Sequence, residues 1–264
     1  DVIAFPPPGV IRRIRRVVTD PVDVVSTHTR FFPMTWTGIA LASALGVPTI
    51  HTEHGSGFVA GGSVLVRSAS RAVDVTMGRR SLRRADRVLG VSDAVVAFVR
   101  RLASVEATEF RNAIDLAQWR MPHQRPAGPR RLVFVGRLVP GKGWEDFLEA
   151  GAALLTEGRD VELHVFGDGE DADAMRQMAE ERRIDAALTM HGISAPHEIA
   201  DALAGEILVN PTVLAEGFQT SLVEAAVLGA ATVSYPVAGI TALMRSGAPI
   251  IQVDPNARSL ADGI

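Results

Sequence analysis

The stretch RLVFVGRLVPGKGW, residues 131–144, carries the pattern that decides the fold. It opens with the apolar, β-branched run RLVFVG (131–136), which is typical of a buried strand in a parallel sheet. A glycine-rich turn follows, and then WEDFLEAGAALLTEG (144–158) shows helical periodicity that ends at Gly158. A strand, a glycine-rich turn and a helix in this order predict part of a βαβ unit.

The same alternation continues toward the C-terminus, which favours a parallel sheet with helical crossovers. The further expected elements are a strand VELHVFG (161–167), a helix ADAMRQMAEERR (172–183), the strands ALTMHG (187–192), EILVNP (206–211) and ATVSYP (231–236), and the start of a helix in SLADGI (259–264).

Alternation of the same kind precedes the central stretch. The expected elements are a strand VDVVS (22–26), a helix TWTGIALASALG (35–46), a strand VPTIHT (47–52), a long helical segment from Ser63 to Ala85, a strand RVLGVS (87–92), a helix DAVVAFVRRLA (93–103) and the closing segment TEFRNA (108–113). Between the two halves, MPHQRPAGPRR (121–131) has prolines, charges and no apolar periodicity, which indicates an interdomain linker.

The sequence therefore predicts an α/β protein with two doubly wound, Rossmann-like domains. We expect an N-terminal domain at 1–121, a linker at 122–130 and a C-terminal domain at 131–264. The chain starts at Asp1 and stops at Ile264 within a helical pattern, so we expect truncation at both ends. Ligands of such sheets bind beyond the carboxyl ends of the strands, so candidate site residues should follow strands.

Composition narrows the class of protein. Of the 264 residues, 47% are apolar and 22% are charged, which is typical of a globular protein with a substantial core. The net charge of -3 gives no general attraction to nucleic acid. The chain has no cysteine, which excludes disulfides and thiolate zinc sites and fits a cytoplasmic protein.

The first candidate site is the loop that follows the strand at 131–136. Gly136, Gly141 and Gly143 allow the backbone to approach an anion, while Arg137 and Lys142 would neutralise it. The N-terminus of the next helix adds partial positive charge, so the loop predicts a diphosphate cradle. Two alternatives stay open. One is an ordinary strand-to-helix turn, and the other is a triphosphate P-loop, which the motif disfavours because Gly143 stands where a Ser or Thr would hold magnesium.

The second candidate is EGFQTSLVEAAVLGA (216–230), after the strand at 206–211. Glu216 lies on a loop, Gly217 permits close backbone approach, and Glu224 lies near the start of the next helix. A carboxylate accepts two hydroxyl hydrogen bonds, which suits the vicinal diol of a ribose or a hexose. The alternative is structural, because Ser221 and Glu224 also match a helix capping box.

The third candidate is PTIHTEHGSGF (48–58), at the end of an expected strand. His54, followed by Gly-Ser-Gly, fits a polar residue presented at a cleft, and a merely hydrogen-bonded loop histidine is the alternative. His51 and Glu53 also suggest a metal site with His54. That hypothesis is disfavoured because residues three apart on a strand face different ways, so we expect no metal.

The sequence has two weaker features. RRIRR (12–16) and the arginines at 79, 80, 83, 84 and 87 are basic clusters, which are usually solvated helix faces, although an anionic membrane surface is a second interpretation. VFGDGED (165–171) does not match the dinucleotide-binding fingerprint.

Together these motifs resemble the family-4 (group 1) retaining glycosyltransferases of the GT-B fold, over nearly the whole chain. The most specific element is the Glu216-x7-Glu224 pair followed by Gly229, and GRLVPGKG (136–143) comes next. RADRVLGVSDAV (84–95) and FRNAID (110–115) resemble the end of the family's first domain. The resemblance implies two domains that face each other across a cleft.

The resemblance also implies roles for individual residues. Arg137 and Lys142, with Gly136 beside them, would bind the donor diphosphate, and Glu216 would contact the donor sugar. Glu224 would contact the ribose diol, and His54 would lie by the reaction centre. The segment beside the base would be Gly192 and Ile193, and the backbone around the sugar and phosphate would be Gly217, Phe218, Gln219, Thr220, Ser221 and Leu222.

The implied reaction moves a sugar from a UDP- or GDP-linked donor to an acceptor hydroxyl, with retention of anomeric configuration and without a metal or other cofactor. The resemblance places catalysis on His54, Arg137, Lys142 and Glu216. The acceptor would be a glycolipid, a polysaccharide or a small molecule, and we expect no nucleic acid partner. We expect a cytoplasmic protein, with peripheral association at the inner face of the membrane as an option. A non-catalytic nucleotide-sugar-binding protein is the main alternative.

Overall fold

A computed structural model gives the structure of the chain, and it describes residues 5–58, 63–119 and 128–264. Contacts divide the chain into two compact units, Asp1–Asn112 with Ala215–Phe218, and Ala113–Leu214 with Gln219–Ile264. Residues 113–119 go with the second unit, where Ile114 and Trp119 pack against the core. Most of the linker expected at 122–130 lies outside the described residues.

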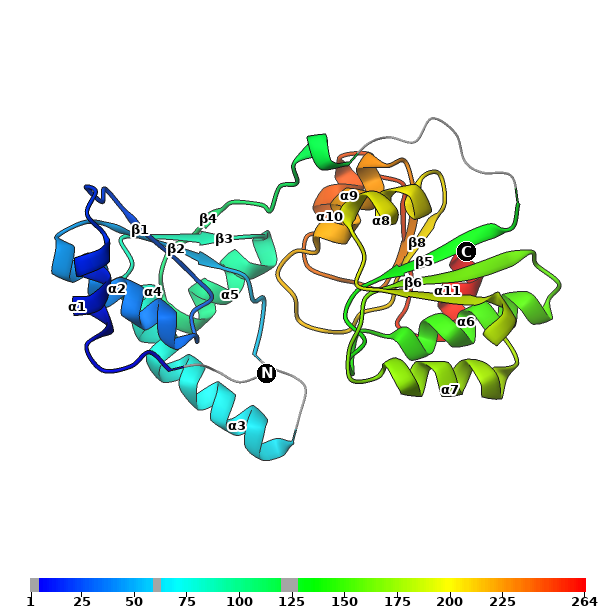
Figure 1. Ribbon diagram of the computed structural model, residues 1–264, viewed down its shortest axis with the longest axis horizontal. Coiled ribbons are helices and arrows are strands. Elements are labelled where there is room, and N and C mark those ends of the chain that lie inside the picture. Colours follow the sequence, from blue (N-terminus) through cyan, green and yellow to red (C-terminus); the bar gives the residue numbers. More distant parts are fainter. Residues whose placement is uncertain (1–4, 59–62, 120–127) are drawn as a thin grey trace. The chain divides into compact units, whose positions relative to one another are not determined.

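The first unit alternates strands and helices as expected (Figure 1). Its elements are α1 (Val10–Val17), β1 (Val25–His28), α2 (Pro33–Leu45), β2 (Thr49–Glu53), α3 (Val64–Val73), the π-helix η1 (Asp74–Gly78), α4 (Arg79–Arg84), β3 (Arg87–Gly90), α5 (Asp93–Ala103) and β4 (Thr108–Glu109).

The four strands of this unit form a parallel sheet in the order β1-β2-β3-β4. The helical segment predicted at 63–85 is confirmed, with a π-helical stretch inside it. The strand predicted at 22–26 is placed too early. It begins at Val25, because Val25 is the first residue that pairs with β2, opposite Thr49.

The second unit has more elements, and all its strands are parallel. Its elements are η2 (Leu116–Gln118), β5 (Arg130–Val135), α6 (Trp144–Thr156), β6 (Val161–Phe166), α7 (Ala172–Arg182), η3 (Asp185–Ala187), β7 (Leu188–Gly192), α8 (Pro196–Leu203), β8 (Ile207–Asn210), α9 (Thr220–Val227), β9 (Ala231–Ser234), α10 (Ile240–Arg245), β10 (Ile250–Gln252) and α11 (Ala257–Gly263).

The second sheet has the order β10-β9-β8-β5-β6-β7, so the chain runs outward from β5 in one direction and then from β8 in the other. This is a doubly wound sheet, as predicted. Helices cover both faces, with α6, α7 and α11 on one side and α8, α9 and α10 on the other (Figure 1). The reversal lies between β5 and β8, where such sheets bind ligands.

Strand β5 shows why the central stretch decides the fold. Leu132 and Phe134 belong to the hydrophobic core on one face of the sheet, together with Phe147 of α6. Val133 belongs to the core on the opposite face, with Leu203 of α8. Because successive side chains of a strand point to opposite faces, a continuous apolar run is what a strand between two helical layers requires.

Six described elements were not expected from the sequence. They are α1, η2, η3, α8, α10 and β10. Each is short, with at most eight residues, and short elements have a weak periodic signal.

Candidate functional site

The reversal point of the second sheet brings two distant sequence motifs into contact. The loop after β5 and the loop after β8 leave the carboxyl ends of adjacent strands. The backbone N–H of Val213 donates to the carbonyl of Gly141 at 2.9 Å. The hydroxyl of Thr212 donates to the same carbonyl at 3.2 Å. Two segments more than 60 residues apart therefore form one backbone surface at the position expected for a ligand.

The loop after β5 takes its shape from glycines. Gly141 and Gly143 have φ angles of 86° and 79°, which only glycine adopts readily. A Cβ at Gly143 would lie 2.1 Å from the carbonyl oxygen of Pro211. Serine or threonine therefore does not fit at position 143, and the geometry weighs against the triphosphate P-loop alternative.

In the sequence of this loop, Arg137 precedes and Lys142 follows Leu138, whose side chain is fully buried. The backbone N–H of Leu138 donates to the carbonyl of Asp168 at 3.0 Å, and that of Gly136 donates to Phe166 at 2.9 Å. Arg137 is exposed and Lys142 is half-buried. They precede helix α6, whose N-terminus has no side-chain cap. An anion here would meet two positive charges and free backbone N–H groups.

The second motif places the N-terminus of α9 beside the same loop. The helix begins at Thr220, and its N-cap residue, Gln219, accepts a hydrogen bond from the amide of Asn210 at 2.7 Å. No side chain caps this end. The capping box considered for Ser221 and Glu224 is therefore wrong, because Ser221 lies inside the first turn instead of at the cap.

Glu224 is consequently available for another role. It lies half-buried in the second turn of α9. Burial raises the pKa of its carboxyl, and a hydrogen bond with Thr220 partly offsets that rise. A partly desolvated carboxylate beside an uncapped helix N-terminus is a candidate for binding a ligand hydroxyl.

The end of β7 supplies a third loop at the same edge of the sheet. Gly192 has a φ angle of 69°, and its carbonyl accepts a hydrogen bond from the N–H of Gly167 at 2.8 Å. Ile193 follows with its side chain 88% exposed. An exposed apolar side chain on a glycine-shaped loop is a suitable surface for a flat ring.

Residues 215–218 pack with the first unit, against the loop after β2. Glu216 forms an antiparallel bridge with Gly55, and its carbonyl accepts a hydrogen bond from the Ser56 hydroxyl at 2.8 Å. A Cβ on Gly217 would lie 2.1 Å from the carbonyl oxygen of His54. Gly217 therefore lies against the backbone of His54, a contact that the sequence did not indicate.

His54 lies at the start of this loop, half-buried. Its Nε2 is 3.1 Å from Nδ1 of His28, at the end of the adjacent strand β1. Burial lowers the pKa of His54, and the neighbouring His28 lowers it further. The structure therefore favours a neutral imidazole at position 54 near pH 7.

His51 and Glu53 lie inside the fold instead of facing a ligand. Both are fully buried, and Nδ1 of His51 is 3.0 Å from the hydroxyl of Thr27. Nε2 of His51 is 3.4 Å from Glu53. Throughout the described ranges, no group of three His, Asp or Glu side chains is arranged to hold a metal ion.

Several residues that build this region escaped the sequence analysis. The guanidinium of Arg30 is buried between Glu53 and Asp74, at 2.9 Å from each carboxylate. His28 and Asn210 were also missed. Each of these residues stands alone in the sequence as a polar residue without a recognisable motif, because its partners lie far along the chain.

The basic clusters lie largely in solvent. In α1 the exposed arginines are Arg12, Arg13, Arg15 and Arg16, and those at 79, 80, 83, 84 and 87 are exposed as well. In the part of the chain that the structure describes, no helix has the length and apolar character needed to cross a bilayer.

Comparison with known proteins identifies the family. Residues 129–264 match the model of the family described as glycosyl transferases group 1, which is just over half of the 264 residues. This chain belongs to the group 1 glycosyltransferases. The first unit of this glycosyltransferase matches a glycosyl transferase 4-like domain over residues 3–112.

Curated relatives include an uncharacterized glycosyltransferase from Methanocaldococcus jannaschii, 27% identical over 85% of this chain and 60% of that protein. The GPI3 subunit of phosphatidylinositol N-acetylglucosaminyltransferase from Saccharomyces cerevisiae is 29% identical over 88% of this chain and 51% of its own length. The chain thus spans between half and two thirds of the length of these relatives.

Solved structures share the fold. Sucrose-phosphate synthase from Thermosynechococcus elongatus matches with a TM-score of 0.80 and 19% identity, over 97% of this chain and 67% of the other. HepE from Anabaena, solved with UDP and glucose, matches with a TM-score of 0.76 and 17% identity, over 96% of this chain and 70% of the other. These matches confirm the predicted GT-B-like α/β fold.

Proposed function

We propose that this glycosyltransferase moves a hexosyl group from a nucleoside-diphosphate sugar to an acceptor hydroxyl, with retention of anomeric configuration and without a metal ion. The observation that carries the proposal is the joined surface at the reversal point of the second sheet. There a loop with two cations, Arg137 and Lys142, contacts the segment that leads into the uncapped N-terminus of α9.

In this proposal the donor diphosphate binds at the loop after β5. Arg137 and Lys142 neutralise its charge, and the backbone around Gly136 lies close to it. Charge develops on the diphosphate as the bond to the sugar breaks. Two fixed cations and uncapped helix N-termini would stabilise that charge more in the transition state than in the bound donor.

The nucleoside would lie along the same edge of the sheet. Glu224 would accept hydrogen bonds from the ribose diol, and Gly192 and Ile193 would border the base. UDP is the first nucleoside diphosphate to test, because the structurally similar HepE was solved with UDP. GDP is the second.

In this proposal Glu216 and the backbone of residues 217–222 contact the sugar, and His54 acts at the reaction centre. The acceptor hydroxyl would attack the anomeric carbon on the face from which the diphosphate departs. One carbon–oxygen bond forms as the other breaks, and the acceptor proton passes to the leaving phosphate oxygen. Front-face attack of this kind retains configuration.

Three classes of acceptor are compatible with this reaction. A glycolipid, a polysaccharide and a small molecule all supply a hydroxyl. A glycolipid acceptor would bring the protein to the inner face of the membrane, where exposed arginines such as those of α1 would favour anionic headgroups. We otherwise place the protein in the cytoplasm.

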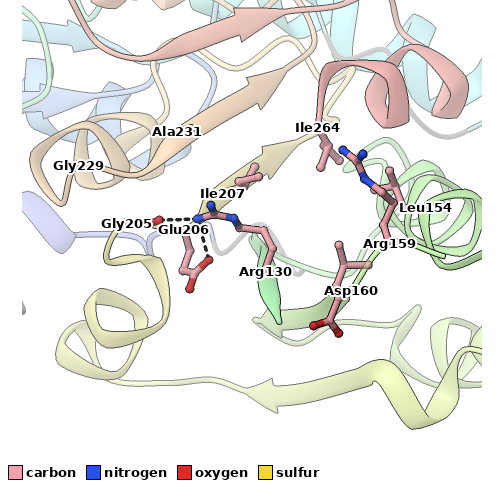
Figure 2. Close-up of a pocket in the computed structure, with 11 residues that line it drawn as sticks. Arg130, Leu154, Arg159, Asp160, Gly205, Glu206, Ile207, Gly229, Ala231 and Ile264 are labelled. Carbon is pink, nitrogen blue, oxygen red and sulfur yellow. Dashed lines mark hydrogen bonds and ion pairs between the residues drawn. The ribbon is translucent and has the colours of Figure 1, made fainter. Parts of the chain in front are cut away.

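Isothermal titration of the chain with UDP, GDP and ADP tests the donor site, with EDTA added in a parallel series. We expect one diphosphate to bind equally well with and without EDTA. Lys142→Ala should weaken that binding about tenfold or more, because a charge-assisted hydrogen bond is lost. Arg159→Ala is the control, since Arg159 lies between α6 and β6, before the amino end of that strand, where it lines the separate pocket drawn in Figure 2.

Transfer itself is tested on the full-length gene product with the donor that the titration selects, and product anomers are assigned by NMR. Retention is expected. An inverted product, or binding abolished by EDTA, would refute the corresponding part of the proposal. Unchanged diphosphate binding in Lys142→Ala would refute the site assignment.

A further inference from the structure

Arg30 is a charged side chain in an interior position of the first unit, with 1% of its surface exposed. Its Nη1 donates to Glu53 at 2.9 Å. Its Nη2 donates to Asp74 at 2.9 Å and to the carbonyl of Gly57 at 3.0 Å. The guanidinium also lies over the ring of Phe98, with its carbon 4.6 Å from the ring centre. Every direction around this cation is therefore occupied by protein.

The surrounding backbone is shaped to admit this side chain. A Cβ on Gly55 would lie 3.0 Å from Nη1 of Arg30, and a Cβ on Gly78 would lie 3.3 Å from its Cγ. Asp74 and Gly78 are the first and last residues of the π-helix η1. Inserted π-helical turns are rare and are found frequently at functional sites.

Glu53 connects this buried cluster to His54. One carboxylate oxygen accepts the backbone N–H groups of His54 and Gly55, at 3.1 Å and 2.9 Å. The other oxygen accepts the backbone N–H of Arg30 at 3.0 Å. The carboxylate therefore fixes the backbone at the point where the chain leaves β2 and turns at His54.

Stability alone is a poor explanation for the cluster. Two carboxylates and one guanidinium, each at most 1% exposed, must be removed from water, and their attraction seldom exceeds that desolvation cost. Among the described residues, Nε of Arg30 and Oδ1 of Asp74 are buried without a hydrogen-bond partner. Apolar residues of similar size would fill the same space without a buried charge, but only an acceptor at position 53 pairs with the backbone N–H groups of Arg30, His54 and Gly55.

We propose that Arg30, Glu53 and Asp74 are positioning residues of the transfer reaction, which hold the backbone of His54 and Gly55 so that the His54 ring is presented in one orientation. This inference rests on the proposed function, in which His54 lies at the reaction centre. The three residues act through His54 and touch no substrate.

The test compares two variants of the full-length gene product with the wild type. Glu53→Gln keeps the shape and removes the charge that accepts the His54 and Gly55 N–H groups. The triple variant Arg30→Met/Glu53→Leu/Asp74→Leu replaces the whole cluster with apolar side chains, so no buried charge is left unpaired. The control is Arg100→Met/Glu106→Leu, an exposed ion pair at 2.7 Å in the same unit.

We expect the triple variant to fold but to melt below the wild type, because the backbone N–H groups of Arg30, His54 and Gly55 lose their acceptor. It should still bind the donor diphosphate with an unchanged Kd. Its kcat should fall about 100-fold with little change in donor KM, because small displacements of reacting groups have effects of that size. Nitrogen-15 NMR should show altered ring signals for His54. The control should keep kcat within about twofold.

A triple variant that folds, binds the diphosphate and keeps kcat within about threefold would overturn this inference alone. A wild-type protein that binds donor but transfers no sugar would overturn the proposed function and this inference with it. A Glu53→Gln variant that folds, binds the donor diphosphate with the wild-type Kd and keeps the wild-type donor KM, but has a reduced kcat, would support it.

Discussion

Two loops of this glycosyltransferase are held in place by opposite means. The loop after β5 in the second unit is shaped by backbone contact, where Gly143 lies against the carbonyl of Pro211 and no side chain fits. The loop after β2 in the first unit is shaped by buried charge, with Glu53 joined to Arg30 and to the His54 backbone. One loop depends on the absence of side chains and the other on a cluster of buried, hydrogen-bonded acidic and basic side chains.

The difference explains which residues are detectable in the sequence. A glycine-rich loop with interspersed cations is a local motif, and it indicates an anion site even without a structure. A buried ion pair between residues 23 positions apart has no local pattern. The comparison also predicts that the two loops respond differently to substitution.

Removing the buried cation should have the largest effect on stability. Arg30→Met leaves Glu53 and Asp74 buried without a counter-charge, which should cost about 3–5 kcal/mol. Arg111→Met is the matched control, because the Arg111–Glu109 pair at 2.7 Å is exposed and should contribute about 0.5 kcal/mol or less. Urea unfolding of both variants measures the difference, and similar losses would contradict the distinction.

Adding one methyl group should test the backbone-built loop. Gly143→Ala should lower the unfolding free energy by roughly 3 kcal/mol, from left-handed strain together with the clash at Pro211. Gly158→Ala serves as the control. Gly158 has nearly the same φ angle, 78°, but no atom within 4 Å of its Cβ position, so the loss should be about 1 kcal/mol. Equal losses would show that the contact with Pro211 is not rigid.

Glu224 should make donor binding depend on pH. Its pKa is raised by burial, so the carboxylate becomes protonated at a higher pH than an exposed glutamate does. Affinity for UDP-glucose should therefore fall as the pH drops toward that raised pKa, because the protonated acid accepts the ribose diol less well. Glu224→Gln should bind about tenfold more weakly at pH 7 and without this acid-dependent step. Calorimetry at several pH values decides the matter, and an unchanged pH profile in Glu224→Gln would assign the dependence to another group.

The smallest expected effect comes from the single tyrosine of the chain, whose hydroxyl donates to Asp146 at 2.6 Å. Burial and Asp146 raise the pKa of Tyr235. Above pH 10 the unfolded phenol ionises while the folded one stays protonated, so stability should fall as the pH rises. Tyr235→Phe should abolish this alkaline loss at a cost of about 1 kcal/mol at pH 7. Phenolate absorbance should appear only with unfolding, and ionisation of the folded chain near pH 10 would contradict the prediction.

Much of the fold was predictable because its signals are local. The continuous apolar run of β5, the turn at Gly136–Gly143 and the helical periodicity of 64–84 each arise from neighbouring residues. The start of α9 was predicted less well. A capping box at Ser221 was plausible from spacing, but Asn210 holds Gln219 as the N-cap residue and the helix begins at Thr220. That contact comes from another strand, so no local pattern could report it.

By itself, the sequence determined the α/β alternation, the glycine and cation loop at 136–143 and the spacing of Glu216 and Glu224, because periodicity and motif spacing are properties of adjacent residues. Only the tertiary structure decided that the loops after β5 and β8 form one surface at the reversal of the sheet. It also decided that Arg30, Glu53 and Asp74 meet beneath His54. Such contacts depend on which strands become neighbours, and strand order is fixed by the packing of the whole chain.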